Sequence, residues 1–332
     1  MSSQRPRPIQ ARRRPARGAA LFAVIVASAV CIGLVCAVRG HIPRLSHLLA
    51  PIGSDTIATG VMHAAIPLSL STGIDLIDVD LAASNYRPAI LAENVSLSRL
   101  GLAGDAYSPS AWLARRQALA VVNGGYFGRG KQDRKEIIGL FVKNGRILRP
   151  APPIRGQGGA FVGAGLYVRS AFGITREGNP QIAWASTPSH GGEGVYAYVT
   201  PNDPHGGRRW NIQDAIGCGP MLVRAGRPVV TDHQERLVDD LRTARTFVAY
   251  DTIQGHPRHF VIGVANAATY KDLAQALIRY YARAHGTKPA RAMCVDGGSS
   301  SQLSYKSGGQ TLTPLATSVA MPTAIAIVPA GS

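Results

Sequence analysis

The sequence is poor in the residue patterns that build metal sites and serine hydrolases. It has four cysteines in 332 residues, with no CxxC pair and no histidine cluster, which argues against structural zinc. It also lacks the acidic ligand pattern of a calcium loop. No G-x-S-x-G motif surrounds the serines at 299–301, which argues against a serine hydrolase. We therefore expect neither a metal nor a cofactor.

The N-terminal part of the chain contains an arginine-rich segment without acidic residues, followed by a segment without any charged residue. Residues 1–17 carry six arginines, and residues 18–38 form a run of 21 residues without charge. Such a run is long enough to span a bilayer, and the preceding arginines favour a cytoplasmic N-terminus. We expect a basic cytoplasmic tail at 1–17, a transmembrane signal anchor at 18–38 and a juxtamembrane connector at 39–72. Small residues at 27–29 and 35–37 leave signal cleavage open.

This topology predicts a single-pass cell-membrane protein whose C-terminal domain is periplasmic or extracellular. Acids are scarce throughout, with 19 Asp and Glu against 36 Lys and Arg and a net charge of +17. Subtracting the eight arginines of residues 1–44 leaves +9 for the rest. An exported domain with this surplus suits an anionic ligand and not nucleic acid. A solvated arginine-rich surface without a specific partner is the alternative.

Cys218 and Cys294 are the cysteines outside the predicted span. Because an exported pair of cysteines can oxidise, they form a candidate disulfide. Two buried free thiols are the alternative.

Short apolar runs separated by turn residues dominate residues 73–330. Asn144–Gly145 and Ala225–Gly226 predict hairpins over 137–148 and 221–230. The alternation of apolar and acidic residues over 74–81 predicts a half-buried strand with solvated acids.

One helix is predicted over residues 269–285, with a capping box at Thr269 and Asp272. The helix connects strands predicted at 259–265 and 291–295, which we expect to be parallel neighbours. The predicted fold is a single α+β domain over 73–330, with a mixed β-sheet of many short strands and hairpins and one long crossover helix.

Four stretches set a polar residue or a tight turn at the edge of an apolar run. They lie at 121–127, 216–220, 243–247 and 295–299. If their ends converge, Asn123, Arg245 and Asp296 contribute an amide, a guanidinium and a carboxylate to one cleft, beside backbone N–H groups. Arginine forks and glycine loops suit a phosphate ester. Each stretch alone also fits an ordinary turn or strand end.

In this order, NGGYF at 123–127, GCGPML at 217–222, ARTFVAYD at 244–251, VDGGSSS at 295–301 and the tail AMPTAIAIV resemble the phosphodiester glycosidase family. The resemblance covers about residues 73–329. The family includes the lysosomal uncovering enzyme, which removes N-acetylglucosamine from a mannose 6-phosphate diester, and many bacterial exported proteins, some linked to exopolysaccharide.

The resemblance implies that Asp296, Arg245 and Asn123 are catalytic. It also implies a set of substrate-binding residues: Gly124, Gly125, Phe127, Gly219, Pro220, Thr246, Gly297, Gly298 and Ser299. Three positions depart from the family pattern, because Ala249, Cys294 and Ser299 stand where Gly, Asn and Gly are usual. These departures leave the identity of the sugar open.

A phosphodiester leaves as a stabilised anion, so its cleavage needs more charge stabilisation and less acid catalysis than that of an ordinary glycoside. We expect Arg245 to bind the phosphate and Asp296 to assist the anomeric carbon or activate water. The predicted function is an exported, membrane-anchored hydrolase that cleaves the glycosidic bond of sugar-1-phosphodiesters in a glycan or glycoconjugate. The alternative is a non-catalytic phosphoglycan-binding protein of the same fold that assists exopolysaccharide or cell-envelope assembly. The oligomeric state stays open.

Overall fold

The structure is a computed structural model that describes residues 53–98, 101–131, 133–157, 164–189, 193–231, 235, 237 and 240–331. All of them belong to one compact unit, Leu48–Ser332. The predicted tail at 1–17 and the predicted span at 18–38 lie outside the described residues. Within the described ranges, no helix is long and apolar enough to cross a membrane. The predicted membrane anchor, and the localisation inferred from it, therefore have no support from the structure.

Strands dominate the described residues, which form sheets of eight, seven, five, four and two strands. Every strand pair in these sheets is antiparallel. The α-helices of the same ranges are α2 (Pro109–Arg115) and α3 (Tyr270–Ala284). The protein is mostly β, and the predicted α+β class is wrong, because these two helices add only 7 and 15 residues.

The eight-stranded sheet is the centre of the fold. It contains, in spatial order, β1 (Ser54–Ala58), β2 (Val61–Pro67), β3 (Gly73–Asp80), β22 (His256–Ala268), β21 (Thr243–Ile253), β23 (Arg291–Cys294), β19 (Met221–Arg224) and β20 (Arg227–Pro228). β1 and β2 occupy part of the predicted connector at 39–72; β1 pairs with β2, and β2 pairs with β3, as regular sheet strands. The connector prediction is wrong for these strands.

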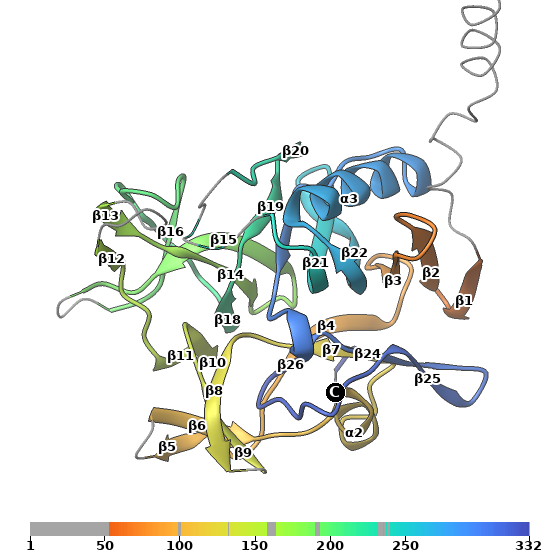
Figure 1. Ribbon diagram of the computed structural model, residues 1–332, viewed down its shortest axis with the longest axis horizontal. Helices are drawn as coiled ribbons and strands as arrows, with labels where there is room; N and C mark the ends of the chain where they lie inside the picture. The colour runs from red at the N-terminus through yellow and green to blue at the C-terminus, as the bar shows by residue number, and fades with distance from the viewer. Residues whose placement is uncertain are drawn as a thin grey trace, which may run out of the picture. The chain divides into compact units, whose positions relative to one another are not determined.

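The five-stranded sheet lies on the side of the eight-stranded sheet that is opposite α3, and the seven-stranded sheet lies beside it (Figure 1). The five-stranded sheet contains β25 (Gln310–Leu315), β24 (Leu303–Ser307), β7 (Ala120–Asn123), β26 (Ala324–Pro329) and β4 (Tyr86–Leu91). The seven-stranded sheet contains β11 (Arg146–Arg149), β10 (Phe141–Lys143), β18 (Asp214–Cys218), β14 (Arg169–Ile174), β15 (Pro180–Ser186), β16 (Tyr196–Tyr198) and β17 (Arg208–Arg209). The smaller sheets are β5 (Ser96–Ser98), β6 (Gly101–Asp105), β9 (Arg134–Ile137) and β8 (Phe127–Lys131), and β12 (Ile154–Gln157) with β13 (Ala164–Tyr167).

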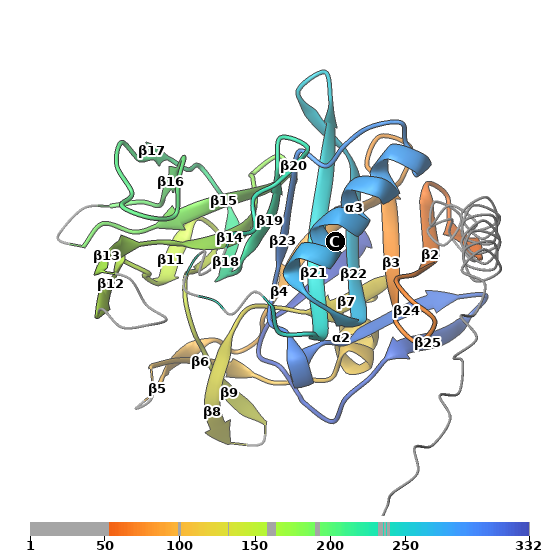
Figure 2. The same cartoon turned by 45° about the horizontal axis from the view of Figure 1, so that its top comes forward.

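The alternation of β3 explains how the eight-stranded sheet is buried on both faces. Ile74 and Leu76 belong to the apolar cluster that contains the α3 side chains, whereas Ile77 and Val79 belong to the cluster shared with the five- and seven-stranded sheets. Figure 2 shows α3 crossing β21 and β22 on the first of these faces. The acids of β3 were predicted to be solvated, but Asp78 is only 3% exposed because it points at α3 and accepts a hydrogen bond from Tyr280. That part of the strand prediction is wrong.

The predicted helix is present as α3. Its N-terminus has the expected capping box, in which Thr269 accepts from the backbone of Asp272 and Asp272 accepts in return. Leu273, Leu277 and Tyr281 form its buried face, and each buried apolar side chain contributes about 1.5–3 kcal/mol. The strands that α3 connects are not neighbours, however, because β21 lies between β22 and β23 and pairs antiparallel with both. The predicted parallel pairing is wrong.

Both predicted hairpins are confirmed. The pairs β10–β11 and β19–β20 close at Asn144–Gly145 and Ala225–Gly226. All four turn residues have positive φ, at 51° and 73° in the first turn and at 50° and 73° in the second. This is the geometry of a type I′ turn, which matches the twist of the flanking strands.

Candidate functional site

The four motif segments are joined to one another by backbone hydrogen bonds around residues 294–296. This short segment begins at the last residue of β23 and donates to three neighbouring segments: Cys294 N to Pro220 O at 2.9 Å, Val295 N to Thr246 O at 3.0 Å and Asp296 N to Gly124 O at 3.1 Å. Segments that are far apart in the sequence therefore meet at the turn that begins with Asp296.

Asn123 ends β7 and is fully buried. Its Nδ2 donates to the carbonyl oxygen of Asp296 at 2.7 Å. Its Oδ1 accepts from Thr246 Oγ1 at 2.6 Å and from the backbone N of Gln302 at 3.1 Å. Asn123 and Thr246 therefore lie behind the turn, where they position the backbone of Asp296 and do not face solvent.

The carboxylate of Asp296 is half-buried. Burial raises its pKa, and hydrogen bonds from the Ser300 hydroxyl and from the backbone N of Gly297 oppose this rise. The Gly297 bond to Oδ1 is 3.0 Å long and shapes the turn. A partly desolvated carboxyl group with a raised pKa is also suited to proton transfer, which makes Asp296 a candidate for proton transfer as well as a turn residue.

Arg245 lies beside this turn on β21 and is 6% exposed. Its Nε donates to the carbonyl of Ala268 at 3.2 Å, and its Nη2 donates to the carbonyl of Leu241 at 2.6 Å. The guanidinium stacks 3.8 Å from the ring centroid of Tyr270. Among the described residues no carboxylate forms an ion pair with it, so a rigidly held positive charge remains for an anionic ligand.

The remaining nitrogen of this guanidinium faces the Asp296 turn. A Cβ built on Gly297 would lie 3.8 Å from Nη1 of Arg245 and 3.2 Å from the carbonyl oxygen of Ala244. Gly298 has a φ of +61°, which favours glycine, and Ser299 after it is exposed. Gly297 thus lies next to the guanidinium, and Gly298 and Ser299 continue the turn that begins at Asp296.

Other predicted substrate-binding residues hold the fold together. The backbone N of Gly124 donates to Thr323 O at 3.0 Å, and that of Gly125 donates to Thr323 Oγ1 at 3.2 Å. These N–H groups are occupied, and a side chain at Gly124 would collide with Thr323. Phe127 packs against the apolar cluster around α2, beneath the Lys135 ammonium at 4.9 Å from its ring centroid.

Gly219 and Pro220 form a cis peptide bond and are both buried. Gly219 has a φ of +138°, and a side chain there would collide with the carboxylate of Glu235. Its carbonyl accepts a hydrogen bond from the Tyr126 hydroxyl at 3.0 Å. These two residues fix the course of the chain beside Asp296 and present a carbonyl to Tyr126.

The candidate disulfide is not formed. Cys218 and Cys294 are both free and buried. Burial raises the pKa of both thiols, that of Cys294 to about 12. The charge of Asp296 adds to the rise in the pKa of Cys218. The alternative of two buried thiols is the correct one in this structure.

Sequence reasoning missed Glu235, which is fully buried. Its carboxylate accepts four hydrogen bonds: from Ser170 N, Ser170 Oγ and Trp184 Nε1 at 2.7 Å each, and from Met221 N at 2.9 Å. Glu235 thereby ties its own segment to β14, β15 and β19. An acid with no motif around it gives no signal in the sequence, because its partners come from distant strands.

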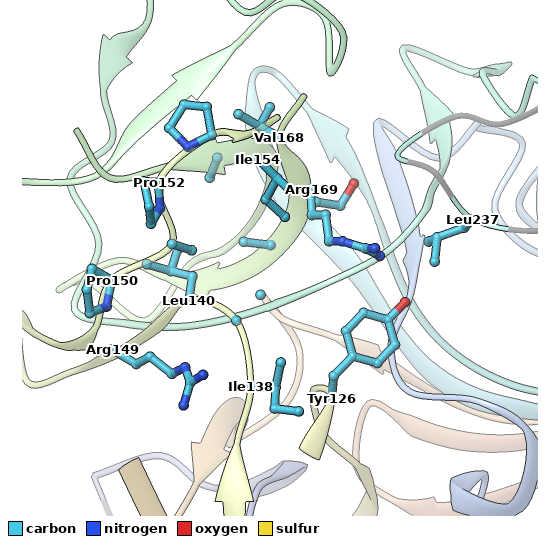
Figure 3. A pocket seen from close by; sticks show the side chains of 17 residues that line it. Tyr126, Ile138, Leu140, Arg149, Pro150, Pro152, Ile154, Val168, Arg169 and Leu237 are labelled. Atoms are coloured by element: carbon cyan, nitrogen blue, oxygen red, sulfur yellow. The ribbon is translucent and has the colours of Figure 1, made fainter. Parts of the chain in front are cut away.

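Sequence reasoning also missed Tyr126 and Arg169, although Tyr126 lies within NGGYF. Both line a cavity of about 640 Å³ beside Gly217 (Figure 3). The guanidinium of Arg169 lies 5.6 Å from the ring centroid of Tyr126. Burial raises the pKa of Tyr126 well above its usual value, so its hydroxyl stays protonated as the donor to Gly219.

Two further carboxylates of the domain form ion pairs. Glu136 pairs with Arg149 at 2.9 Å, and Asp251 pairs with His259 at 2.8 Å. Among the residues that the structure does describe, no group of three or more His, Cys, Asp or Glu is placed to hold a metal ion.

Comparison with known proteins identifies one family. The model of the phosphodiester glycosidase family matches residues 116–328, a segment that contains all four motifs and more than half of the chain. No curated protein matches the sequence. A crystal structure described as "Putative exported protein" from Burkholderia pseudomallei K96243 is similar over 80% of this chain and 74% of that chain. Its identity is 12% and its TM-score is 0.47, which is too low to support an argument. The chain belongs to the phosphodiester glycosidase family, a family of glycosidase-type hydrolases.

Proposed function

We propose that the protein hydrolyses the glycosidic bond of sugar-1-phosphodiesters, with Arg245 binding the phosphate and Asp296 acting at the anomeric carbon. The observation that carries the proposal is that a half-buried carboxylate and a guanidinium both lie next to Gly297: Asp296 Oδ1 accepts from its backbone N, and Arg245 Nη1 is 3.8 Å from the position of a Cβ on it. Among the described residues, this guanidinium has no acidic partner. Family membership supports the same reaction class.

In this reaction a water oxygen bonds to the anomeric carbon as the bond from that carbon to the phosphate oxygen breaks. The electron pair of the broken bond leaves on the phosphate, which becomes a monoester. Arg245 stabilises the charge that develops there, because a fixed guanidinium in a partly desolvated site needs no reorganisation. Asp296 accepts the proton of the attacking water and later releases it to solvent.

A second carboxylate of the kind used by ordinary glycosidases is not required, because the phosphomonoester is a good leaving group. Glu235 lies close by but is fully buried, and its oxygens accept hydrogen bonds from four donors. We assign it a positioning role. The glycines at 124 and 125 serve the same purpose by seating β7 against Thr323.

The test is turnover of the purified full chain on a panel of glycosyl phosphodiesters and nucleotide sugars, with the products followed by NMR. We expect release of the free sugar and a phosphomonoester, and loss of this release in Asp296→Asn. Binding of the diesters without any product would contradict the hydrolase and leave the non-catalytic phosphoglycan-binding alternative.

A further inference from the structure

The cavity beside Tyr126 differs in character from the polar turn at Asp296. Its volume of about 640 Å³ falls within the range of about 300–1,000 Å³ that is typical of ligand pockets. Its walls are mainly aliphatic, with Leu140 near Pro150 and Pro152, and Ile154 near Val168 (Figure 3). A sugar ring would bring many hydroxyl groups with few partners on these walls, whereas a hydrocarbon chain matches them.

One end of the cavity is cationic. Arg149 lines it too, but pairs with Glu136 at 2.9 Å. Arg169, in contrast, has only the rings of Tyr126 and Tyr167 near its guanidinium, at 5.6 and 5.9 Å, and forms no ion pair with an acid of the described residues. Figure 3 shows its guanidinium directed toward the Tyr126 hydroxyl. An uncompensated arginine at the end of an aliphatic cavity is complementary to an anion that carries a hydrocarbon chain.

This cationic end adjoins the segments that carry the candidate site. Tyr126 lines the cavity, donates to the carbonyl of Gly219 and lies two residues after Gly124, whose carbonyl accepts from the backbone N of Asp296. Cys218 pairs across the sheet with Ser170, the neighbour of Arg169 on β14, and Pro220 accepts from the backbone N of Cys294 just before the Asp296 turn. A phosphate that contacts both Arg245 and Arg169 would place its sugar at Asp296 and its other substituent in the cavity.

We propose that the cavity binds the alcohol portion of the phosphodiester, that this alcohol is a hydrocarbon chain, and that Arg169 binds the phosphate together with Arg245. The proposal takes the phosphodiester from the proposed function and adds the class of its second substituent. Arg169 is a substrate-binding residue in this assignment, and Ile154 is a wall of the hydrocarbon pocket.

The test uses the product half of such a substrate, so that it needs neither the identity of the sugar nor turnover. Calorimetry measures binding of geranyl phosphate, methyl phosphate and geraniol to the full chain. We expect geranyl phosphate to bind at least about 100-fold more tightly than methyl phosphate, because its longer chain buries more apolar surface. We also expect it to bind at least about 10-fold more tightly than geraniol, which lacks the charge.

Matched variants separate the two contributions. Arg169→Gln is expected to weaken both phosphates by about 10-fold or more, whereas Arg155→Gln on β12, which removes an exposed arginine outside the cavity lining, leaves them unchanged. Ile154→Ser is expected to weaken geranyl phosphate by about 5-fold or more and to spare methyl phosphate. Leu166→Ser removes another exposed aliphatic side chain, on β13 and outside the cavity lining, and is the control. Circular dichroism checks that each variant is folded.

The outcomes distinguish the two proposals. Equal binding of geranyl and methyl phosphate, or equal effects of Ile154→Ser and Leu166→Ser, would overturn the pocket assignment even if diesters are hydrolysed. Tight, Arg169-dependent binding of geranyl phosphate by a protein that cleaves no glycosyl phosphodiester would support the pocket and overturn the proposed hydrolysis.

Discussion

The side-chain amide of Asn123 donates to the backbone carbonyl of Asp296 at 2.7 Å, across 173 positions of the sequence. Asn123 ends a strand of the five-stranded sheet, and Asp296 follows a strand of the eight-stranded sheet. This one bond therefore links the two sheets at the point where the candidate catalytic carboxylate begins its turn. The position of that carboxylate depends on a residue that does not face solvent.

Asn123→Ala is expected to lower the free energy of unfolding by about 2–4 kcal/mol. The carbonyl of Asp296, the hydroxyl of Thr246 and the backbone N of Gln302 would each lose a partner in a buried place, and an unsatisfied buried group costs about 1–3 kcal/mol. Urea denaturation measures the change. Asn211→Ala, at an exposed asparagine, should stay within about 0.5 kcal/mol of the parent protein. Equal effects of the two substitutions would mean that Asn123 does not hold the turn.

Local features of the fold could be predicted because their causes are local. The hairpin at Asn144–Gly145 needs two residues with positive φ, and the start of α3 needs Thr269 and Asp272 at a fixed spacing. Features that depend on residues far away in the sequence could not be predicted. Nothing near Asp78 in the sequence shows that Tyr280 will cover it, and nothing near β22 shows that β21 will separate it from β23.

Some residues of the candidate site could be predicted from the sequence, and others could not. The motif order led to Asp296 and Arg245, and both lie at one turn. The motifs could not show that Asn123 faces the interior, because its partners are a backbone carbonyl and a hydroxyl from other strands. Arg169 belongs to no motif, and only the packing of β14 beside Tyr126 brings it to the cavity.

Asp296→Asn is expected to lower kcat by at least about 100-fold without changing the unfolding curve. The amide oxygen of Asn can still accept from the backbone N of Gly297, so the turn is preserved, but the group can no longer take a proton from water. Stopped assays on a glycosyl phosphodiester, paired with thermal denaturation, separate these effects. Full activity in this variant would reduce Asp296 to a turn residue.

The raised pKa of Asp296 also predicts a pH profile. Burial is the main cause of the rise, and the hydrogen bonds from Ser300 and Gly297 N only partly offset it. If the ionised carboxylate is the active form, kcat/KM falls as pH drops through a pKa above 3.8, the ordinary aspartate value. A profile measured from pH 3 to pH 8 checks this, and a flat acid limb down to pH 3 would contradict a role for the ionised carboxylate.

Arg245→Lys is expected to impair phosphodiester substrates by about 10-fold or more relative to neutral aryl glycosides of the same sugar. Lysine keeps the charge but loses the planar fork, and it cannot reproduce both the bond to Leu241 O and the stack on Tyr270. The ratio of kcat/KM values for the two substrates is the measurement. Arg176→Lys, at an exposed arginine, is the control. An equal loss on both substrates would show that Arg245 acts on the fold and not on the phosphate.

A second pH-dependent element lies at the C-terminal end of α3, outside the candidate site. His259 donates or accepts through Nδ1 at 2.8 Å from Asp251, and its ring stacks 3.7 Å from that of His285. His285 in turn contacts Asp78 at 2.7 Å. Burial lowers the pKa of His259. The hydrogen bond and charge of Asp251, together with the charges of Asp78 and Asp80, outweigh this effect, so the pKa is raised above its ordinary value.

These contacts predict a defined dependence of stability on pH. Because the folded pKa of His259 is raised, its contribution is complete below the unfolded value of about 6.5 and is lost as pH rises through the folded value. Burial raises the pKa of Asp251, but hydrogen bonds from His259 and Thr287 lower it more. Its contribution is therefore present above the unfolded value and lost as pH falls through the folded one. We expect the pair to stabilise the fold most between the unfolded pKa of Asp251 and the unfolded pKa of His259.

His259→Gln is expected to lower the free energy of unfolding by about 1.5–3 kcal/mol at pH 6, because it removes a charge-assisted hydrogen bond to a fully buried carboxylate. The difference from the parent protein should shrink as pH rises above the folded pKa of His259, where the parent loses the same charge. Urea denaturation at pH 6, 7, 8 and 9 measures this convergence. His256→Gln changes an exposed histidine of the same strand and should follow the parent curve throughout. If the difference in unfolding free energy between His259→Gln and the parent stays constant from pH 6 to pH 9, His259 stabilises the fold by packing and not through its protonated form.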